Sequence, residues 1–248
     1  MKRVDLNCDL GEGAGHDAEL MRLITSANIA CGAHAGDPAT MRTTVALANK
    51  HGVAIGAHPG FADRANFGRR ELPVSPDEVH RLVHDQVLQL QAIARAAGGR
   101  LAHVKPHGAL YNQAARDTLM AQAVVMAIYE ADPRLILFGL AGSQLVAAAE
   151  ACGLPVAREV FADRTYQADG LLTPRAQPNA VITDEAAAVT QVLRMVREGR
   201  VRSSDGADVM IQADTVCLHG DGAHPVGFAR RLRSELVAAG VELRAPGA

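Results

Sequence analysis

Residues 101–108 read LAHVKPHG, an apolar run of strand length that ends directly in a lysine, a proline, a histidine and a glycine. Most of the other short apolar runs also end in polar residues. The runs are Val4–Leu6, Ile29–Cys31, Val53–Ile55, Leu101–Val104, Leu135–Phe138, Val156–Val160 and Val216–Leu218. Acids, amides and histidines follow them at residues 7–12, 34–37, 58–60, 105–108, 163–164 and 219–221. This repetition indicates one rim built by many strand-end loops, as in a parallel α/β enzyme.

Segments with helical start and stop signals separate these apolar runs. A first-turn proline opens three of them, at Pro38, Pro76 and Pro225. The predicted helices are Asp17–Ile24, Asp37–Lys50, Ser75–Ala97, Tyr111–Ala131, Ser143–Cys152, Asp184–Glu198 and His224–Gly240, with short β-like segments at 209–211 and 241–243. Strands that alternate with helices predict a parallel sheet, and seven or eight such units favour a closed (β/α) barrel over an open doubly wound sheet.

The bulk composition restricts the class of protein. A length of 248 residues without a linker or repeat predicts a single domain, residues 1–248, and the 48% hydrophobic content supports a large aliphatic core. The net charge of −2 favours neither nucleic acid nor an anionic membrane. The N-terminus lacks a signal-peptide pattern, and no apolar run approaches membrane-spanning length, so we expect a cytoplasmic protein. The cysteines show no CxxC spacing and are expected to be buried thiols.

The first strand carries an unusual set of polar side chains. Strand alternation places Asp5, Asn7 and Asp9 on one face, which in a barrel can be the inner face, and Glu12 follows shortly after. Acceptor-rich side chains stacked in a barrel interior are costly unless they bind a ligand or one another. The alternative is that Asp5 and Asn7 bond to neighbouring backbone groups.

Histidines follow four of the predicted strands. They are His34, His58, His107 and His219, with Asp37 and Asp221 close by in the sequence. Such side chains at strand ends could hold a divalent metal that activates water. Neutral imidazoles could equally serve as general base and acid. Spacing does not decide between these chemistries, because the side chains would come from different strands.

Cationic side chains add a preference for anions. Lys105, at a strand end and held by Pro106, suits stabilisation of an oxyanion or a phosphoryl group, although a lysine can also extend to solvent. Two long irregular segments, 58–74 and 162–179, are expected to act as binding loops. They carry Arg64, Arg69, Arg70, Arg164 and Arg175, whose guanidinium groups can bind carboxylate or phosphate. Glu159 and Asp163 could lend a carboxylate to the same site.

Several of these stretches together resemble one protein family. Residues 4–12, 28–37, 56–60, 67–70, 103–112, 159–164 and 218–221 closely resemble the motifs of the LamB/YcsF family, in order and over nearly the whole chain. The resemblance implies an irregular TIM-like (β/α) barrel of the glycoside hydrolase/deacetylase type. It also implies the ATP-dependent opening of 5-oxo-L-proline to L-glutamate with release of ADP and phosphate, together with two partner subunits, B and C. The chain lacks both a GxGxxG and a GxxxxGK[ST] motif, which agrees with ATP being handled by a partner or at an unrelated site.

The implied reaction suggests roles for the polar rim. Lys105 would stabilise the developing negative charge, His58 or His107 would be the general base, and Asp9 or Glu12 would orient that base or the water. The expected substrate-binding residues are Asn7, His34, Asp37, Arg69, Arg70, Asp163, Arg164, His219 and Asp221. ATP, accompanied by Mg²⁺, is expected as a co-substrate, and no structural metal is firmly expected.

Two alternatives remain open at this point. One is a metal-dependent deacetylase or amidohydrolase on the same barrel, with Asp9, His34 and His58 as metal ligands. The other is a non-catalytic subunit that binds a lactam or a sugar while its partners carry out the chemistry.

Overall fold

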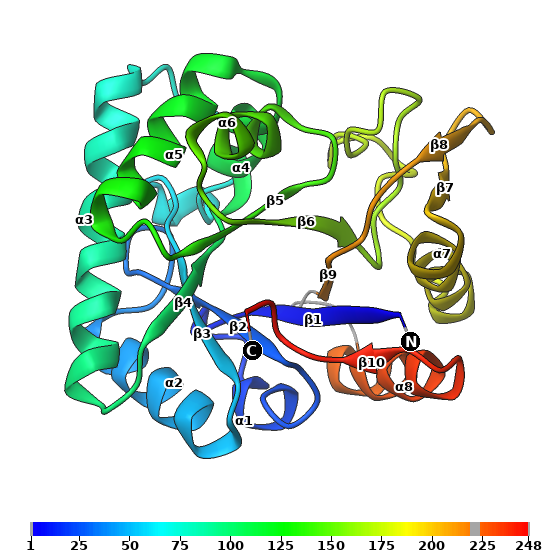
Figure 1. The fold of residues 1–248 in the computed structure, drawn as a ribbon, viewed down its shortest axis with the longest axis horizontal. Coiled ribbons are helices and arrows are strands. Elements are labelled where there is room, and N and C mark those ends of the chain that lie inside the picture. The colour runs from blue at the N-terminus through cyan, green and yellow to red at the C-terminus, as the bar shows by residue number, and fades with distance from the viewer. Residues whose placement is uncertain (1, 219–223, 248) are drawn as a thin grey trace.

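Seven parallel strands close into a barrel in the computed structural model, which describes residues 2–218 and 224–247 (Figure 1). The strands are β1 (Arg3–Leu10), β2 (Ser26–Ala30), β3 (Ala54–His58), β4 (Leu101–Val104), β5 (Ile136–Leu140), β6 (Val156–Phe161) and β9 (Thr215–Leu218). They pair in the order β1-β2-β3-β4-β5-β6-β9, and β9 pairs back onto β1 with Asp5 opposite Thr215. A short strand, β10 (Glu242–Leu243), lies beside the start of β1. The predicted TIM-like barrel is therefore confirmed.

Helices cover the outside of the strands (Figure 1). They are α1 (Asp17–Leu20), α2 (Pro38–His51), α3 (Pro76–Ala96), α4 (Gly108–Arg116), α5 (Thr118–Ala131), α6 (Gln144–Cys152), α7 (Glu185–Glu198) and α8 (Pro225–Ala238). The predicted starts have clear causes. The carboxylate of Asp37 accepts from the Thr40 N–H at 2.7 Å, and Ser75 forms a capping box with Glu78 at the start of α3. Among the described residues, none of the helices has both the length and the apolar composition to span a bilayer.

The structure corrects two predicted elements and confirms a third. The single helix predicted over 111–131 is two helices, because Asp117 has extended backbone and its carboxylate caps α5 by accepting from the N–H groups of Leu119 and Met120. α1 is only one turn long, since Thr25 turns the chain into β2 by donating its N–H to Leu6 O. The β-like segment predicted at 209–211 is confirmed as β8 (Asp208–Met210). It forms an antiparallel ribbon with β7 (Arg200–Arg202) next to α7 at the edge of the molecule (Figure 1).

The alternation along β1 places apolar and polar residues on opposite faces of the barrel wall. Leu6 and Cys8 belong to the apolar core beneath the helices. Asp5 and Asn7 are equally buried but point into the barrel, where their partners come from other strands. The prediction that these polar groups share one inner face is confirmed. Their hydrogen-bond partners are side chains of neighbouring strands, such as Ser26, Asn28 and Thr215.

The Asp5 carboxylate occupies a cluster of hydroxyl groups inside the barrel. It accepts hydrogen bonds from Thr25 and Thr215, both at 2.5 Å, and from Ser26 at 2.7 Å. Burial is the largest influence on this group and raises its pKa from 3.8 to about 6, even though the three hydroxyls favour the charged form.

We therefore expect the free energy of unfolding to contain a contribution from Asp5 that falls as pH rises. The unfolded chain releases this proton near pH 4 and the native chain near pH 6, so in between the native state binds more protons and loses stability. A shift of about two pKa units corresponds to about 3 kcal/mol. Urea unfolding of wild type and Asp5→Asn between pH 4 and 7 measures the difference. Parallel pH profiles for the two proteins would show that Asp5 titrates normally.

Candidate active site

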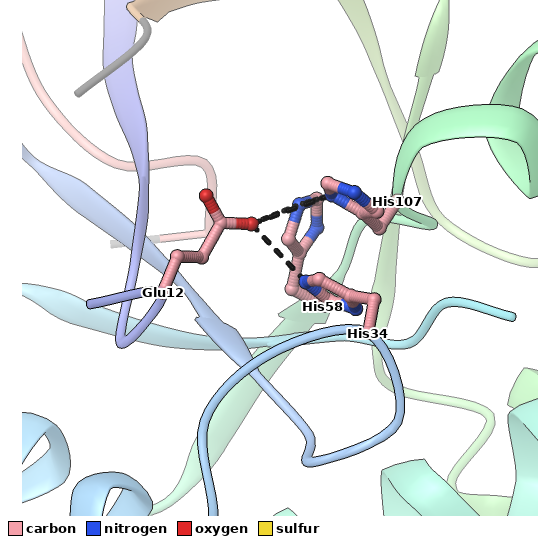
Figure 2. A group of neighbouring side chains, drawn as sticks. All are labelled: Glu12, His34, His58 and His107. Atoms are coloured by element: carbon pink, nitrogen blue, oxygen red, sulfur yellow. Dashed lines mark hydrogen bonds and ion pairs between the residues drawn. The ribbon is translucent and has the colours of Figure 1, made fainter. Parts of the chain in front are cut away.

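Side chains from four successive strand ends meet at one mouth of the barrel. Asp9 lies near the end of β1, and His58 is the last residue of β3. Lys105 directly follows β4, and His107 precedes α4. Glu12 and His34 come from the turns after β1 and β2 (Figure 2). The carboxyl ends of the strands of a (β/α) barrel form one face, so these residues converge although they are far apart in sequence.

The Lys105 ammonium is fixed between two carboxylates. Its Nζ lies 2.9 Å from Asp9 Oδ1 and 3.0 Å from Glu159 Oε1, and the side chain is 3% exposed. Burial acts to lower the pKa of Lys105, but these carboxylates outweigh it and hold the pKa well above its ordinary value. Tyr111 donates to the other oxygen of Glu159 at 2.7 Å. The result is a permanently charged, immobile cation at the barrel mouth.

Side-chain amides deeper in the barrel bond to the two carboxylates that hold this cation. Asn28 donates to Asn7 Oδ1 at 2.7 Å and to Asp9 Oδ1 at 2.8 Å, while Asn7 donates to Glu159 Oε1 at 3.0 Å. His103 Nε2 lies 2.8 Å from Asn28 Oδ1, an acceptor, so this nitrogen carries the proton. Burial lowers the pKa of His103 to about 3 and keeps its ring neutral. The network orients both carboxylates of the ion pair.

Three imidazoles and one carboxylate form a second group beside the lysine (Figure 2). His107 Nδ1 lies 2.9 Å from His58 Nε2, and His34 Nε2 lies 3.1 Å from Glu12 Oε1. The rings of His34 and His107 are stacked 3.7 Å apart. Burial lowers the pKa values of His34 and His107 to about 3. Burial also opposes protonation of His58, but the nearby Asp9 and Glu12 more than offset it, and its pKa is raised.

A cavity of about 520 Å³ opens above these residues. Asp9, Glu12, His58, Lys105 and His107 contribute to its lining. Its walls come partly from the two long loops, which supply Arg69, Glu71, Arg164, Leu171, Leu172 and Arg175. Both segments predicted to be binding loops therefore border the cavity. Its size suits a small molecule with anionic groups.

The arginines of these loops have different positions. Arg69 lines the cavity with its guanidinium 4.9 Å from the centre of the Phe67 ring. Arg70 is 65% exposed and pairs with Asp63 at 3.5 Å. Arg164 is buried and donates to the carbonyls of Thr173 and Ala180, and burial lowers its pKa to about 10, so it stays charged at neutral pH. Arg69 and Arg164 are thus placed to meet an anion in the cavity.

The remaining predicted residues lie elsewhere. Asn7 is one layer deeper in the barrel, and Asp37 is an exposed helix cap on α2. Asp163 is partly buried in the loop after β6, where its backbone carbonyl accepts from the Ile182 N–H. His219 and Asp221 fall outside the described residues.

Three further residues of the site were not among the predicted site residues, although they lie in stretches that resemble the family motifs. Asn28 lies inside β2, and Tyr111 lies inside α4. His103 lies in β4, and alternation from Lys105 could have placed it on the inner face. These residues act by hydrogen bonding to other residues of the site. A match to a sequence motif does not show that role.

Comparison with known proteins gives close matches over the full length. A profile of the LamB/YcsF family matches residues 4–248. A Brevibacillus brevis protein, named as the A subunit of 5-oxoprolinase, is 57% identical, with 99% of this chain and 98% of that protein aligned. Its namesake in Bacillus subtilis is 56% identical over 99% of this chain and 97% of that protein.

Solved structures also match over nearly the full length of the chain. A lactam utilization protein from Thermus thermophilus superposes with a TM-score of 0.91 at 47% identity, covering 98% of this chain and 99% of that one. A putative cellobiose-phosphate cleavage protein from Enterococcus faecalis, with a TM-score of 0.56 at 14% identity and coverage of 98% of this chain and 96% of that one, shares the fold alone.

Proposed function

Because the chain belongs to the LamB/YcsF family, we propose that it opens the ring of 5-oxo-L-proline to give L-glutamate at the expense of ATP. It would act as the A-type component of a larger enzyme, with two further subunits, B and C. Its relatives are named as the A subunit of 5-oxoprolinase and as a lactam utilization protein, and these names support a hydrolase that acts on a lactam. The observation that carries the proposal is the buried Lys105 ammonium at the floor of a cavity bordered by arginines.

The chemical difficulty of the reaction is the stability of the lactam amide. Transfer of the γ-phosphoryl group of ATP to the lactam oxygen releases ADP and makes the ring carbon electrophilic. Water then adds to that carbon, and the ring C–N bond breaks as the nitrogen takes up a proton, which leaves a γ-glutamyl phosphate. A second water releases phosphate and completes glutamate. Negative charge develops on oxygen at each of these steps.

Lys105 is positioned to stabilise that charge. Its ammonium is already desolvated and held by Asp9 and Glu159, so it need not reorganise as charge develops on the substrate. The position next to His58 and His107 places a proton acceptor within the same cavity. Asp9 Oδ2 lies 3.3 Å from His58 Nε2 and orients that ring. Mg²⁺ accompanies ATP as part of the co-substrate in this proposal.

We expect Arg69, rather than Arg70, to bind the carboxylate of 5-oxoproline. In the assembled enzyme, Arg69→Ala should raise the KM for 5-oxoproline by about 10- to 100-fold, the loss of one charge-assisted hydrogen bond, with a smaller change in kcat. Arg70→Ala is the matched control, because its side chain is exposed and paired with Asp63. Steady-state kinetics at saturating ATP measure both. Equal effects of the two substitutions would remove Arg69 from the binding site.

The nucleotide requirement tests the proposed function against its two alternatives. We expect ring opening only with ATP, and one ADP for each glutamate. The group of three histidines also suits a metal-dependent amidohydrolase. Such an enzyme would open the ring or remove acetyl groups without nucleotide. A subunit that only binds the lactam would let Lys105 variants turn over normally in the assembled enzyme. Either result would replace the proposal.

A further inference from the structure

The facing ring nitrogens of His58 and His107 lie too close together for both to be unprotonated without a cation nearby. His58 Nδ1 is 2.7 Å from the carbonyl oxygen of Lys105, and His107 Nε2 is 2.8 Å from the carbonyl oxygen of Phe67. A carbonyl only accepts, so both of these nitrogens carry the ring proton. In two neutral rings, His58 Nε2 and His107 Nδ1 then point lone pairs at each other across 2.9 Å. Such a pair requires a cation between or beside the rings, either a proton or a metal ion.

The hydrogen bonds around two of the three histidines, His58 and His107, match those of metal-binding histidines. A histidine that ligates a metal nearly always donates its other ring N–H to a carbonyl, a carboxylate or water, which fixes the tautomer. Both His58 and His107 do so, to carbonyls from separate segments. Phe67, which accepts from His107, has φ of 54°, a left-handed conformation that costs a non-glycine residue about 1–2 kcal/mol. The residue whose carbonyl fixes the His107 ring therefore has a strained backbone conformation.

Two further donor atoms complete the group. Glu12 Oε1 lies 3.1 Å from His34 Nε2, 3.4 Å from His107 Nδ1 and 3.8 Å from His58 Nε2. Four atoms bound tetrahedrally at ~2.0–2.1 Å would lie roughly 3.3 Å from one another. These four separations, from 2.9 to 3.8 Å, bracket that value, and all four donor atoms lie within 4.8 Å of one another. In Figure 2 the four side chains point toward a common centre.

We propose that Glu12, His34, His58 and His107 bind one divalent transition-metal ion of the zinc class. Three imidazole nitrogens suit zinc, cobalt or nickel, whereas Mg²⁺ prefers oxygen ligands, so this site is distinct from the Mg²⁺ of ATP. The set also differs from the ligands that the sequence suggested. Asp9 Oδ1 accepts from Lys105 and Asn28, and Glu12 and His107 join His34 and His58 in its place.

Metal binding stands independently of the proposed function, because it is measured without substrate. A role in ring opening rests on that function: with metal bound, His58 and His107 would be ligands instead of proton acceptors, and the ion beside Lys105 at the cavity floor would polarise the lactam oxygen or water.

Metal binding to the tag-free, chelator-treated chain tests the site. Zinc alone should bind at one equivalent by calorimetry, and Co²⁺ should give the visible spectrum of a tetrahedral nitrogen and oxygen site. Loss of a group that only orients a ligand typically weakens metal binding by about 10- to 100-fold, so removal of a ligand itself in His107→Gln or Glu12→Gln should weaken it at least as much. His80→Gln is the matched control, because His80 pairs with Glu130 at 3.0 Å on the protein surface.

Circular dichroism establishes that each variant is folded. Should His107→Gln fail to fold, Glu12→Gln carries the test, because it preserves side-chain size in a turn outside the strands. Equal zinc affinity in wild type and a folded ligand variant would overturn the proposal. So would the absence of tight zinc and cobalt binding in wild type, which would assign the cation between His58 and His107 to a proton. Neither result depends on whether the chain opens 5-oxoproline.

Discussion

Replacing Lys105 by methionine should lower kcat for ATP-dependent ring opening by about 100- to 1000-fold, the usual effect of removing one pre-positioned charge-stabilising donor. The ammonium is buried and held between Asp9 and Glu159, so solvent cannot replace it. Among the residues that the structure describes, no other lysine lines this cavity. The measurement is glutamate formation by the assembled enzyme at saturating ATP and 5-oxoproline. Lys50→Met, at an exposed position of α2, should leave kcat unchanged.

The stability of the variant must be separated from its chemistry. Lys105→Met leaves the buried Glu159 carboxylate and the largely buried Asp9 carboxylate without their cation, and breaking a buried ion pair in this way costs about 3–5 kcal/mol of stability. Adding Glu159→Gln removes one of those charges and should recover part of the lost stability. Activity should stay low in the double variant, because the cation is still absent. Recovery of activity together with stability would mean that Lys105 serves the fold alone.

The substitution Gly56→Ala should destabilise the chain by at least about 3 kcal/mol, the upper range for overpacking a core. A β carbon on Gly56 would lie 1.9 Å from His103 Nε2, far inside contact distance. The His103 ring cannot move aside, because it stacks on Phe138 at 4.1 Å and bonds to Asn28. Close approach of a buried ring is thus the reason for a glycine in the middle of β3. Urea unfolding followed by circular dichroism measures the loss.

A second glycine provides the control. Gly227 lies in α8 with nothing within 4 Å of its β-carbon position, so Gly227→Ala should be neutral or stabilise by up to about 1 kcal/mol. Placing His103→Ala in the Gly56→Ala background should cost less than the same change in wild type, because the overlap is then relieved. Additive losses would place the cost of Gly56→Ala somewhere other than His103.

The number and order of the barrel strands were the most predictable part of the fold. Apolar runs identified the barrel strands, and first-turn prolines together with capping by Asp37 and Ser75 identified helix starts. The runs predicted at 4–6, 29–31 and 53–55 were shorter than β1, β2 and β3, because the barrel interior is polar, whereas the run at 101–104 coincides with β4. Asn7, Asn28 and His58 interrupt the apolar runs yet lie within strands. A prediction based on continuous apolar sequence therefore makes a strand too short where its inward-facing residues are polar.

Part of the residue set at the barrel mouth was predictable, but its geometry was not. Glu12, His58 and Lys105 follow apolar runs, and that pattern was enough to place them at one mouth. The pairing of Lys105 with Glu159 joins residues from separate strands and depends on the closure of the barrel. The difference between Arg69 and Arg70 arises from the direction of adjacent side chains on one loop. Contacts of this kind are set by tertiary packing, which no local pattern in the sequence contains.

The most direct test of the proposed function is glutamate formation from 5-oxoproline and ATP by this chain and its two partner subunits, with each component omitted in turn. We expect glutamate and ADP in equal amounts when all three are present, and glutamate formation to stop when this chain is left out or carries Lys105→Met. Formation of glutamate at an undiminished rate without this chain would contradict a catalytic role for the mouth of its barrel.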